Sequence, residues 1–182
     1  MTATANRPFV IFRKRTPQRI FICFPGVKAN SLTEKPRNGK HLRAALFLLP
    51  AFFSPTSSLR AAFHRLRGVD LAPDVEVGYE VLFDNLFPER VHVGSGATIS
   101  ARSTILSHDE AKAYAWGERE IVADTYIEEG AFLGVAAVIL PGIRIGARSI
   151  IGAGAIVTDD VPQDTIAVGN PARVIRRRST SE

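Results

Sequence analysis

The chain has 182 residues, 46% of them hydrophobic, which is enough for one domain with a packed core. Its single cysteine, Cys23, excludes an intrachain disulfide and a cysteine-rich metal site, and it favours a reducing compartment. The net charge of +5 conceals two unlike parts: residues 1–67 hold thirteen Lys/Arg and one acidic residue, a net +12, whereas residues 68–182 hold ten Lys/Arg and seventeen acidic residues, a net −7.

Residues 1–40 show no sustained periodicity and mix apolar clusters with basic ones. We interpret them as a basic, poorly ordered extension. The alternatives are an arm that contacts anionic lipid or another polyanion, or a segment outside the functional fold. A targeting peptide is disfavoured, because no charged region, apolar region and cleavage site follow in order.

Residues 41–67 are predicted to be helical. The apolar run Leu42–Phe53 has twelve residues and contains Pro50, whereas a membrane-spanning helix needs ~20 residues. It indicates a short amphipathic or buried helix, with membrane-surface contact as the alternative. A second helix is expected over 57–66, with a serine cap and an end at Gly68, and His64 is expected on its surface.

From Val69 onward an aliphatic or aromatic residue recurs at every sixth position as far as Ile105, and again from Ile121 to Val157. Small residues such as Ala131 and Ala137 occupy the slot four positions later. This period predicts an all-β fold, a left-handed parallel β-helix of hexapeptide repeats over 68–162. Three hexads form one coil, so four to five coils are expected, stacked at roughly 4.8 Å.

The period breaks between Ile105 and Ile121, which are sixteen residues apart, ten more than one hexad. The surplus residues must leave the coil as a loop over 110–120, and such an insertion into a repeat tends to be functional. Beyond Val157, Pro162 is expected to stop the coil. Residues 163–182 are expected to form a C-terminal cap, with a short strand or helix at 172–175, followed by a basic tail.

His108 lies where this insertion begins, at a hexad position that should face outward. Histidine is the natural general base near neutral pH, so the position favours a catalytic role over an ordinary surface histidine. Asp84 occupies the same hexad position in an earlier coil and should also face outward. Asn85 beside it is either an acceptor-binding residue or a corner residue that makes turn hydrogen bonds.

The hexads from Val93, His108 with the acidic Asp109 and a loop after it, then FLGVAAVILPGIRIGARSIIGAGAIVTDDVP and AVGNPARVI, resemble the hexapeptide-repeat acyltransferases over residues 69–176. The maltose/galactoside O-acetyltransferases and the xenobiotic acetyltransferases are the most similar branch. The resemblance implies a homotrimer with active sites between neighbouring subunits and acetyl-CoA as donor. It also implies that His108 takes the proton of an acceptor hydroxyl, while Asp84, expected on another face, contacts the site across the subunit interface to orient the imidazole or bind a sugar hydroxyl.

The same resemblance suggests further binding residues. Those implied for coenzyme A are Gly134, Val135, Ala136, Gly152, Ala153, Thr158, Arg173 and Arg176, although the two arginines could also belong to a solvated tail. On the loop, Tyr114 and Trp116 are expected to stack on the acceptor or on coenzyme A, or else to pin the loop to an adjacent subunit.

Two related enzymes are disfavoured. A γ-class carbonic anhydrase needs three zinc-binding histidines, two of them closely spaced, but His92 and His108 are sixteen residues apart and no metal is expected. The glycine-rich signature of serine O-acetyltransferase is absent. The sequence thus predicts a cytoplasmic, acetyl-CoA-dependent O-acetyltransferase acting on a sugar or polysaccharide precursor, with no nucleic-acid partner and with peripheral membrane contact through its N-terminal segment. A xenobiotic acetyltransferase, or a non-catalytic β-helix scaffold, is the alternative.

Overall fold

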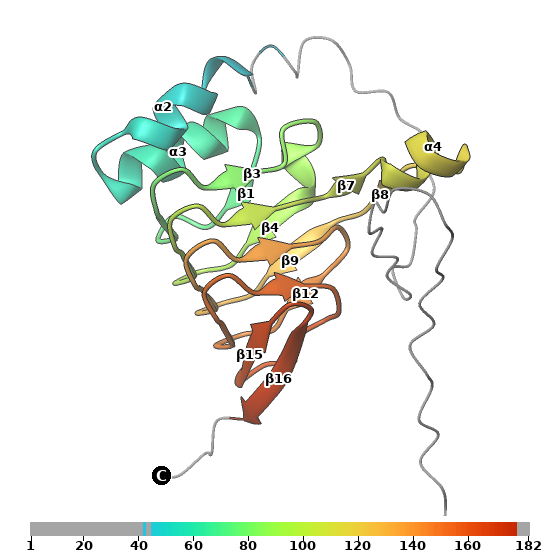
Figure 1. The fold of residues 1–182 in the computed structure, drawn as a ribbon. Coiled ribbons are helices and arrows are strands. Elements are labelled where there is room, and N and C mark those ends of the chain that lie inside the picture. Colours follow the sequence, from blue (N-terminus) through green and yellow to red (C-terminus); the bar gives the residue numbers. More distant parts are fainter. Residues whose placement is uncertain (1–41, 43–44, 178–182) are drawn as a thin grey trace, which may run out of the picture.

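The computed structural model describes residues 42 and 45–177, so the interpretation of residues 1–40 as a basic extension lies outside the described part. Short parallel strands wind into a three-sided β-helix, with two helices over its N-terminal end and a hairpin at the other (Figure 1). Four coils and the beginning of a fifth are present, as predicted.

Each side of the prism is one parallel sheet. Sheet A contains β1 (Asp70–Leu71), β4 (Val91–Val93), β9 (Thr125–Ile127) and β12 (Arg144–Ile145). Sheet B contains β2 (Glu76–Val77), β5 (Thr98–Ile99), β10 (Phe132–Leu133), β13 (Ile150–Ile151), β15 (Thr165–Gly169) and, antiparallel at its edge, β16 (Ala172–Arg177). Sheet C contains β3 (Leu82–Phe83), β6 (Thr104–Ile105), β11 (Val138–Ile139) and β14 (Ile156–Val157).

The hexad explains the prism. One aliphatic residue per strand points inward, and Ile99, Ile105, Leu133, Ile139 and Ile151 are all essentially without solvent exposure. The chain then turns sharply, and the corner between sheets B and C has a left-handed residue in every coil: Glu80, Arg102, Ala136 and Gly154. Only glycine adopts this conformation without a steric cost, so the other three depend on the stacked coils to hold them.

The predicted register is wrong in the first coil. Asp70 pairs with His92, twenty-two positions later, whereas Tyr126 pairs with Arg144, eighteen positions later. The inward residues of this coil are therefore Leu71, Val77 and Phe83, and the predicted Val69, Val75 and Val81 fill the small slots at the corners. The four additional residues form a turn with the 3₁₀ helix η1 (Pro88–Arg90).

The second irregularity is longer than predicted. His92 pairs with Tyr126, thirty-four positions later, so sixteen residues exceed the regular coil instead of ten. Ile121 does not point into the core, because β8 (Ile121–Val122) pairs antiparallel with β7 (His108–Asp109) outside the prism. The expected loop does leave the coil here, but it carries its own helix, α4 (Ala111–Trp116), which ends at the left-handed Gly117.

Helix α3 (Ser57–Arg67) covers the first coil, and α2 (Leu48–Phe53) packs against α3. The end of α3 at Gly68 is confirmed, but its cap is Thr56, whose hydroxyl accepts from Leu59 N–H, and not a serine. His64 was expected on the surface and is instead completely buried against the ring of Phe83. Within the described residues no helix combines the length and the apolar character needed to cross a membrane.

The C-terminal end continues further than predicted. Pro162 does not stop the coil, because β15 pairs in parallel with β13 beyond it. The segment 172–175, expected to be a short strand or helix, is a strand: it belongs to β16, which folds back onto β15 and covers its free edge.

Candidate active site

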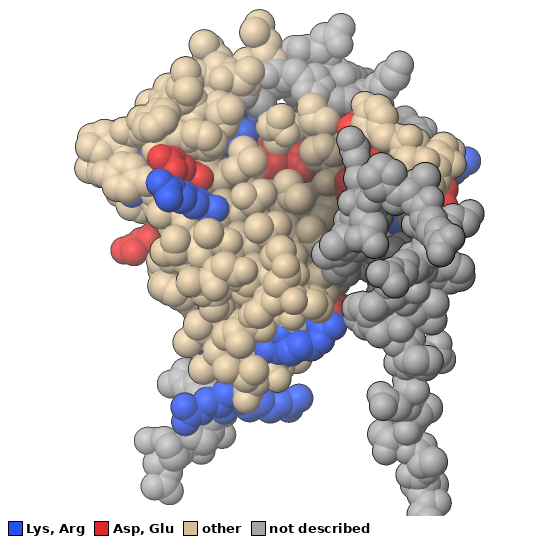
Figure 2. All heavy atoms as spheres, in the orientation of Figure 1, with Lys and Arg blue, Asp and Glu red and all other residues tan. Residues whose placement is uncertain are grey.

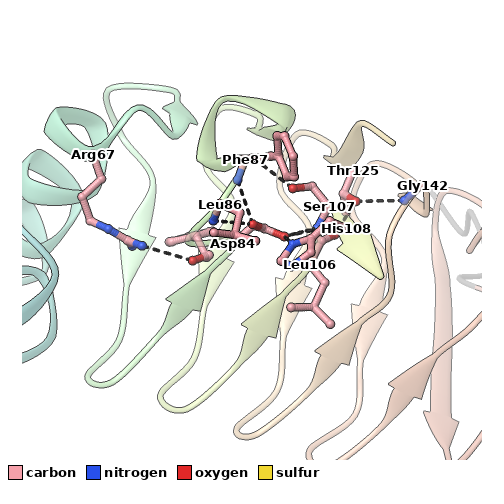
Figure 3. Close-up of polar contacts among 10 residues, drawn as sticks. Arg67, Asp84, Leu86, Phe87, Leu106, Ser107, His108, Thr125 and Gly142 are labelled. Atoms are coloured by element: carbon pink, nitrogen blue, oxygen red, sulfur yellow. Dashed lines mark hydrogen bonds and ion pairs between the residues drawn. The ribbon is translucent and has the colours of Figure 1, made fainter. Parts of the chain in front are cut away.

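Both irregular segments leave the prism at the same corner, between sheets C and A, in successive coils. Asp84 follows β3, and Ser107 and His108 follow β6, the strand that pairs directly with β3. The two departures from the hexad therefore stack on one another. A regular coil has room there only for a tight turn, so these insertions create the polar site shown in Figure 3.

Asp84 is the centre of this site. Its carboxylate is buried and accepts hydrogen bonds from four backbone N–H groups: Leu86 and Phe87 at 2.9 Å on Oδ1, and Ser107 at 2.8 Å and His108 at 3.1 Å on Oδ2. The expectation that Asp84 faces outward, on a different face from His108, is wrong. The longer first coil shifts its register, so the two residues meet within one chain.

The imidazole of His108 is held by this carboxylate. Its Nδ1 lies 2.5 Å from Asp84 Oδ2, and its ring packs edge-on against Phe87, with ring centroids 5.7 Å apart. Because an ionised carboxylate only accepts, Nδ1 must carry a proton, which leaves the lone pair of the neutral ring on Nε2. The side chain is 16% exposed, so the site is enclosed and still reachable from solvent.

The contact between Asp84 and His108 shifts their two pKa values in opposite directions. Burial by itself raises the pKa of Asp84, but the hydrogen bonds from His108 and from the Phe87 and Ser107 backbone outweigh it and lower the pKa to about 2. The hydrogen bond to Asp84 raises the pKa of His108, burial opposes the rise, and the carboxylates of Glu110 and Glu120 add to it. Asp84 is thus an anion at neutral pH, and His108 is a stronger base than a free imidazole.

Two hydroxyls that the sequence pattern did not indicate hold the corner in place. Ser107 Oγ donates to Phe87 O at 2.9 Å, which joins the two irregular turns. Thr125 Oγ1 donates to Leu106 O at 2.6 Å and accepts from Gly142 N–H at 3.1 Å, so it ties the base of the excursion to the next coil. The only signal for these two residues in the sequence is their position, since Ser107 precedes the insertion and Thr125 follows it.

Apart from Asp84, the residues predicted to bind the acceptor are exposed and lie on the two irregular segments. Asn85 is exposed beside the buried Asp84. Tyr114 and Trp116 are both exposed on α4, the outermost part of the excursion. Asp109 accepts from the backbone N–H of Ala111 at 2.8 Å and so supports the start of that helix.

The residues predicted to bind coenzyme A are divided between two corners. Gly134, Val135, Ala136, Gly152 and Ala153 lie between sheets B and C, whereas Thr158 lies between sheets C and A, two coils beyond His108. Thr158 donates to Asp159, and Arg173 reaches the same carboxylate at 3.4 Å. Arg176 is exposed on β16.

Packing alone explains two of these glycines. A Cβ on Gly134 would lie 2.5 Å from Ala153 N, and a Cβ on Gly152 would lie 2.7 Å from Val168 Cγ1. The neighbouring Val135, Ala136 and Ala153 are exposed, so this corner presents small side chains and backbone to solvent. Among the described residues, no group of three His, Cys, Asp or Glu side chains is arranged to hold a metal ion.

The fold is a left-handed β-helix built on hexapeptide repeats, as predicted, and residues 124–159 match the family model described as bacterial transferase hexapeptide (six repeats). The chain is 36% identical over 109 residues to a galactoside O-acetyltransferase of Lactococcus lactis subsp. lactis (strain IL1403), covering 60% of this chain and 46% of that protein. The predicted resemblance to hexapeptide-repeat acyltransferases is thereby confirmed. The chain spans about half the length of this curated relative.

Solved structures share the fold. A hexapeptide-repeat containing acetyltransferase from Vibrio cholerae O1 biovar eltor, complexed with acetyl coenzyme A, has a TM-score of 0.58 at 22% identity, covering 76% of this chain and 87% of that one. A maltose O-acetyltransferase from Clostridium difficile 630 has a TM-score of 0.57 at 24% identity, covering 79% of this chain and 86% of that one.

Proposed function

We propose that this protein is an acetyl-CoA-dependent O-acetyltransferase that acetylates a hydroxyl of a sugar or polysaccharide precursor, with His108 as general base. The observation that carries the proposal is the contact of His108 with the buried Asp84, which leaves Nε2 as the reachable basic atom of the ring. The sugar class is drawn from the galactoside O-acetyltransferase relative.

The geometry suits direct transfer. His108 Nε2 takes the proton of the acceptor hydroxyl as its oxygen attacks the thioester carbonyl, and the oxyanion is stabilised by N–H donors of the cleft. The carbon–sulfur bond then breaks, and the imidazolium returns the proton to the departing thiolate. Asp84 stays ionised throughout and stabilises the imidazolium, so no covalent intermediate on the protein is needed.

A second subunit completes the proposed cleft. His108 and the small-residue corner at Gly134 and Gly152 lie at different corners of one prism, so a neighbouring copy is the simplest way to join them. The outer face of sheet B supports such packing, because the adjacent Phe132 and Ile150 are large, apolar and exposed. A homotrimer is expected in light scattering coupled to size exclusion, and Phe132→Glu should dissociate it; a monomeric wild-type protein contradicts this arrangement.

An acceptor screen tests the activity. Purified protein, acetyl-CoA and a panel of sugars and small antibiotics are combined, and release of free thiol is followed. Turnover with a sugar that is lost in His108→Ala supports the proposal, and turnover with an antibiotic alone favours a xenobiotic acetyltransferase. Unchanged turnover in His108→Ala refutes the base assignment, and failure to bind coenzyme A favours a β-helix scaffold.

The location is part of the proposal: a cytoplasmic enzyme held against membranes through its N-terminal segment. Besides the +12 charge of residues 1–67, α2 and the segment just before it expose Leu46, Leu49 and Phe53, and the surface around these helices carries few charges in Figure 2. Sedimentation with vesicles containing anionic lipid should decrease in Leu46→Glu and when residues 1–40 are deleted. Equal sedimentation of all three proteins contradicts membrane contact.

A further inference from the structure

Three arginines of α3 share one task at the open end of the prism. The first coil has no preceding coil, so backbone carbonyls of its strands need other donors. Arg65 Nε donates to Leu71 O at 3.0 Å on sheet A, and Arg60 Nε donates to Val77 O at 2.8 Å on sheet B. Arg67 Nη2 approaches Phe83 O on sheet C at 3.4 Å.

Arg67 differs from the other two arginines because the carbonyl that it contacts directly precedes an active-site residue, Asp84. Phe83 O belongs to the peptide group that joins Phe83 to Asp84, and in Figure 3 Arg67, Asp84 and His108 follow one another across the first two coils. Arg67 and Asp84 are both almost completely buried. Burial lowers the pKa of Arg67 to about 10, and the negative charge of Asp84 acts against that change. A buried cation and a buried anion therefore face each other through one peptide group.

His64 holds Arg67 without adding a second charge. Its Nδ1 lies 2.9 Å from Arg67 Nη1, and burial, together with the charges of Arg67 and Arg60, lowers its pKa to about 3. The ring is thus neutral at physiological pH and accepts a hydrogen bond from the guanidinium through Nδ1. The proton sits on Nε2, which has no hydrogen-bond partner among the described residues. A buried polar atom without a partner lowers the stability of the fold, and this one lies beside the arginine nearest the active site.

We propose that Arg67 is a positioning residue of the active site: its buried positive charge balances the Asp84 carboxylate and so limits how strongly His108 holds its proton. The catalytic consequence depends on the proposed base role of His108, but the electrostatic effect does not. Without Arg67, Asp84 would lose this opposing charge and act more strongly on His108, together with Glu110 and Glu120. His108 would then stay protonated to a higher pH, and less free base would be present near neutrality.

The test is an NMR titration of the histidine ring signals in the full chain, with His108 assigned from the spectrum of His108→Asn. Two neutral variants remove the charge in different ways: Arg67→Gln keeps a donor for the Phe83 carbonyl, and Arg67→Met fills the space with an apolar chain. Either one carries the test if the other does not fold. Arg67→Lys keeps the charge, and Arg65→Gln removes an arginine with the same capping task on another sheet.

We expect the titration midpoint of His108 to rise by roughly half a pH unit in both neutral variants, and to stay within about 0.2 units of wild type in Arg67→Lys and Arg65→Gln. In the acetyl-transfer assay the acid limb of kcat/KM should move by the same amount. An unchanged midpoint in the neutral variants, or an equal rise in Arg65→Gln, reduces Arg67 to a structural cap. If wild type transfers no acetyl group but the midpoints shift, the proposed function fails and this inference stands.

Discussion

Replacing Asp84 with Asn tests whether one carboxylate supports both the fold and the active site. The side chain is fully buried, and its two oxygens accept four backbone N–H groups and His108 Nδ1. An amide keeps the shape but loses the charge, and its NH₂ group meets donors on whichever side it is placed. We expect a loss of stability with a defined pH dependence.

The magnitude follows from proton linkage. Folding lowers the pKa of Asp84 from 3.8 to about 2, so the carboxylate contributes stability above its unfolded pKa and loses it as the pH falls through the folded one. At pH 5 this contribution is about 2 kcal/mol, and at pH 3 it has fallen to roughly 1 kcal/mol. The stability difference between wild type and Asp84→Asn should therefore narrow between pH 5 and pH 3.

Urea unfolding, followed by circular dichroism at both pH values, gives this difference directly. Asp159→Asn is the matched control, because its side chain is 62% exposed, and it should change stability by less than about 0.5 kcal/mol at either pH. A difference between wild type and Asp84→Asn that is equal at pH 5 and pH 3 would refute the reasoning, since it would mean that the charge of Asp84 is not what folding stabilises.

The site and the coil each give further predictions. His108→Asn should lower kcat by 10² to 10⁴-fold with coenzyme A affinity in calorimetry unchanged; activity within threefold of wild type contradicts the base role. Because Asp84 raises the pKa of His108, the acid limb of kcat/KM should lie above pH 6.5 and move down in Asp84→Asn; an upward move contradicts the pairing. Gly134→Ala places a Cβ 2.5 Å from Ala153 N and should cost about 1–3 kcal/mol in thermal unfolding; an unchanged unfolding temperature contradicts this packing.

The hexad period could be read from the sequence because it comes directly from packing: each coil needs one inward aliphatic residue per side. It predicted the β-helix, the interruption beside His108, and the absence of room for that interruption inside the prism. It failed in the first coil, where Val69, Val75 and Val81 and the true core residues are equally apolar. Two registers fit such a sequence, and only pairing with the next coil decides between them.

The second failure is the inward face of α3. Amphipathic helices usually bury their apolar side, and that rule placed His64 outside. Here Arg60, His64 and Arg67 are buried, while Leu59 and Leu66 are exposed. The surface beneath the helix is the open edge of a β-helix, which presents backbone carbonyls and needs donors more than it needs methyl groups. Spacings of four and three residues put these polar side chains on one helix face, and that was the signal in the sequence.

The two failures are connected through Asp84: the irregular first coil supplies its backbone donors, and Arg67 on the buried face of α3 contacts the carbonyl of the preceding Phe83. In a regular coil the position after β3 would begin a tight corner, as Leu140 and Thr158 do after β11 and β14. The four surplus residues of the first coil instead turn the backbone N–H groups of Leu86 and Phe87 onto the carboxylate. A carboxylate held in this way can remain ionised while buried, and a buried anion is what fixes the tautomer of His108. The acid–base chemistry of the site therefore depends on the first coil not obeying the period, and the regular coils beyond it hold that pair in a rigid frame.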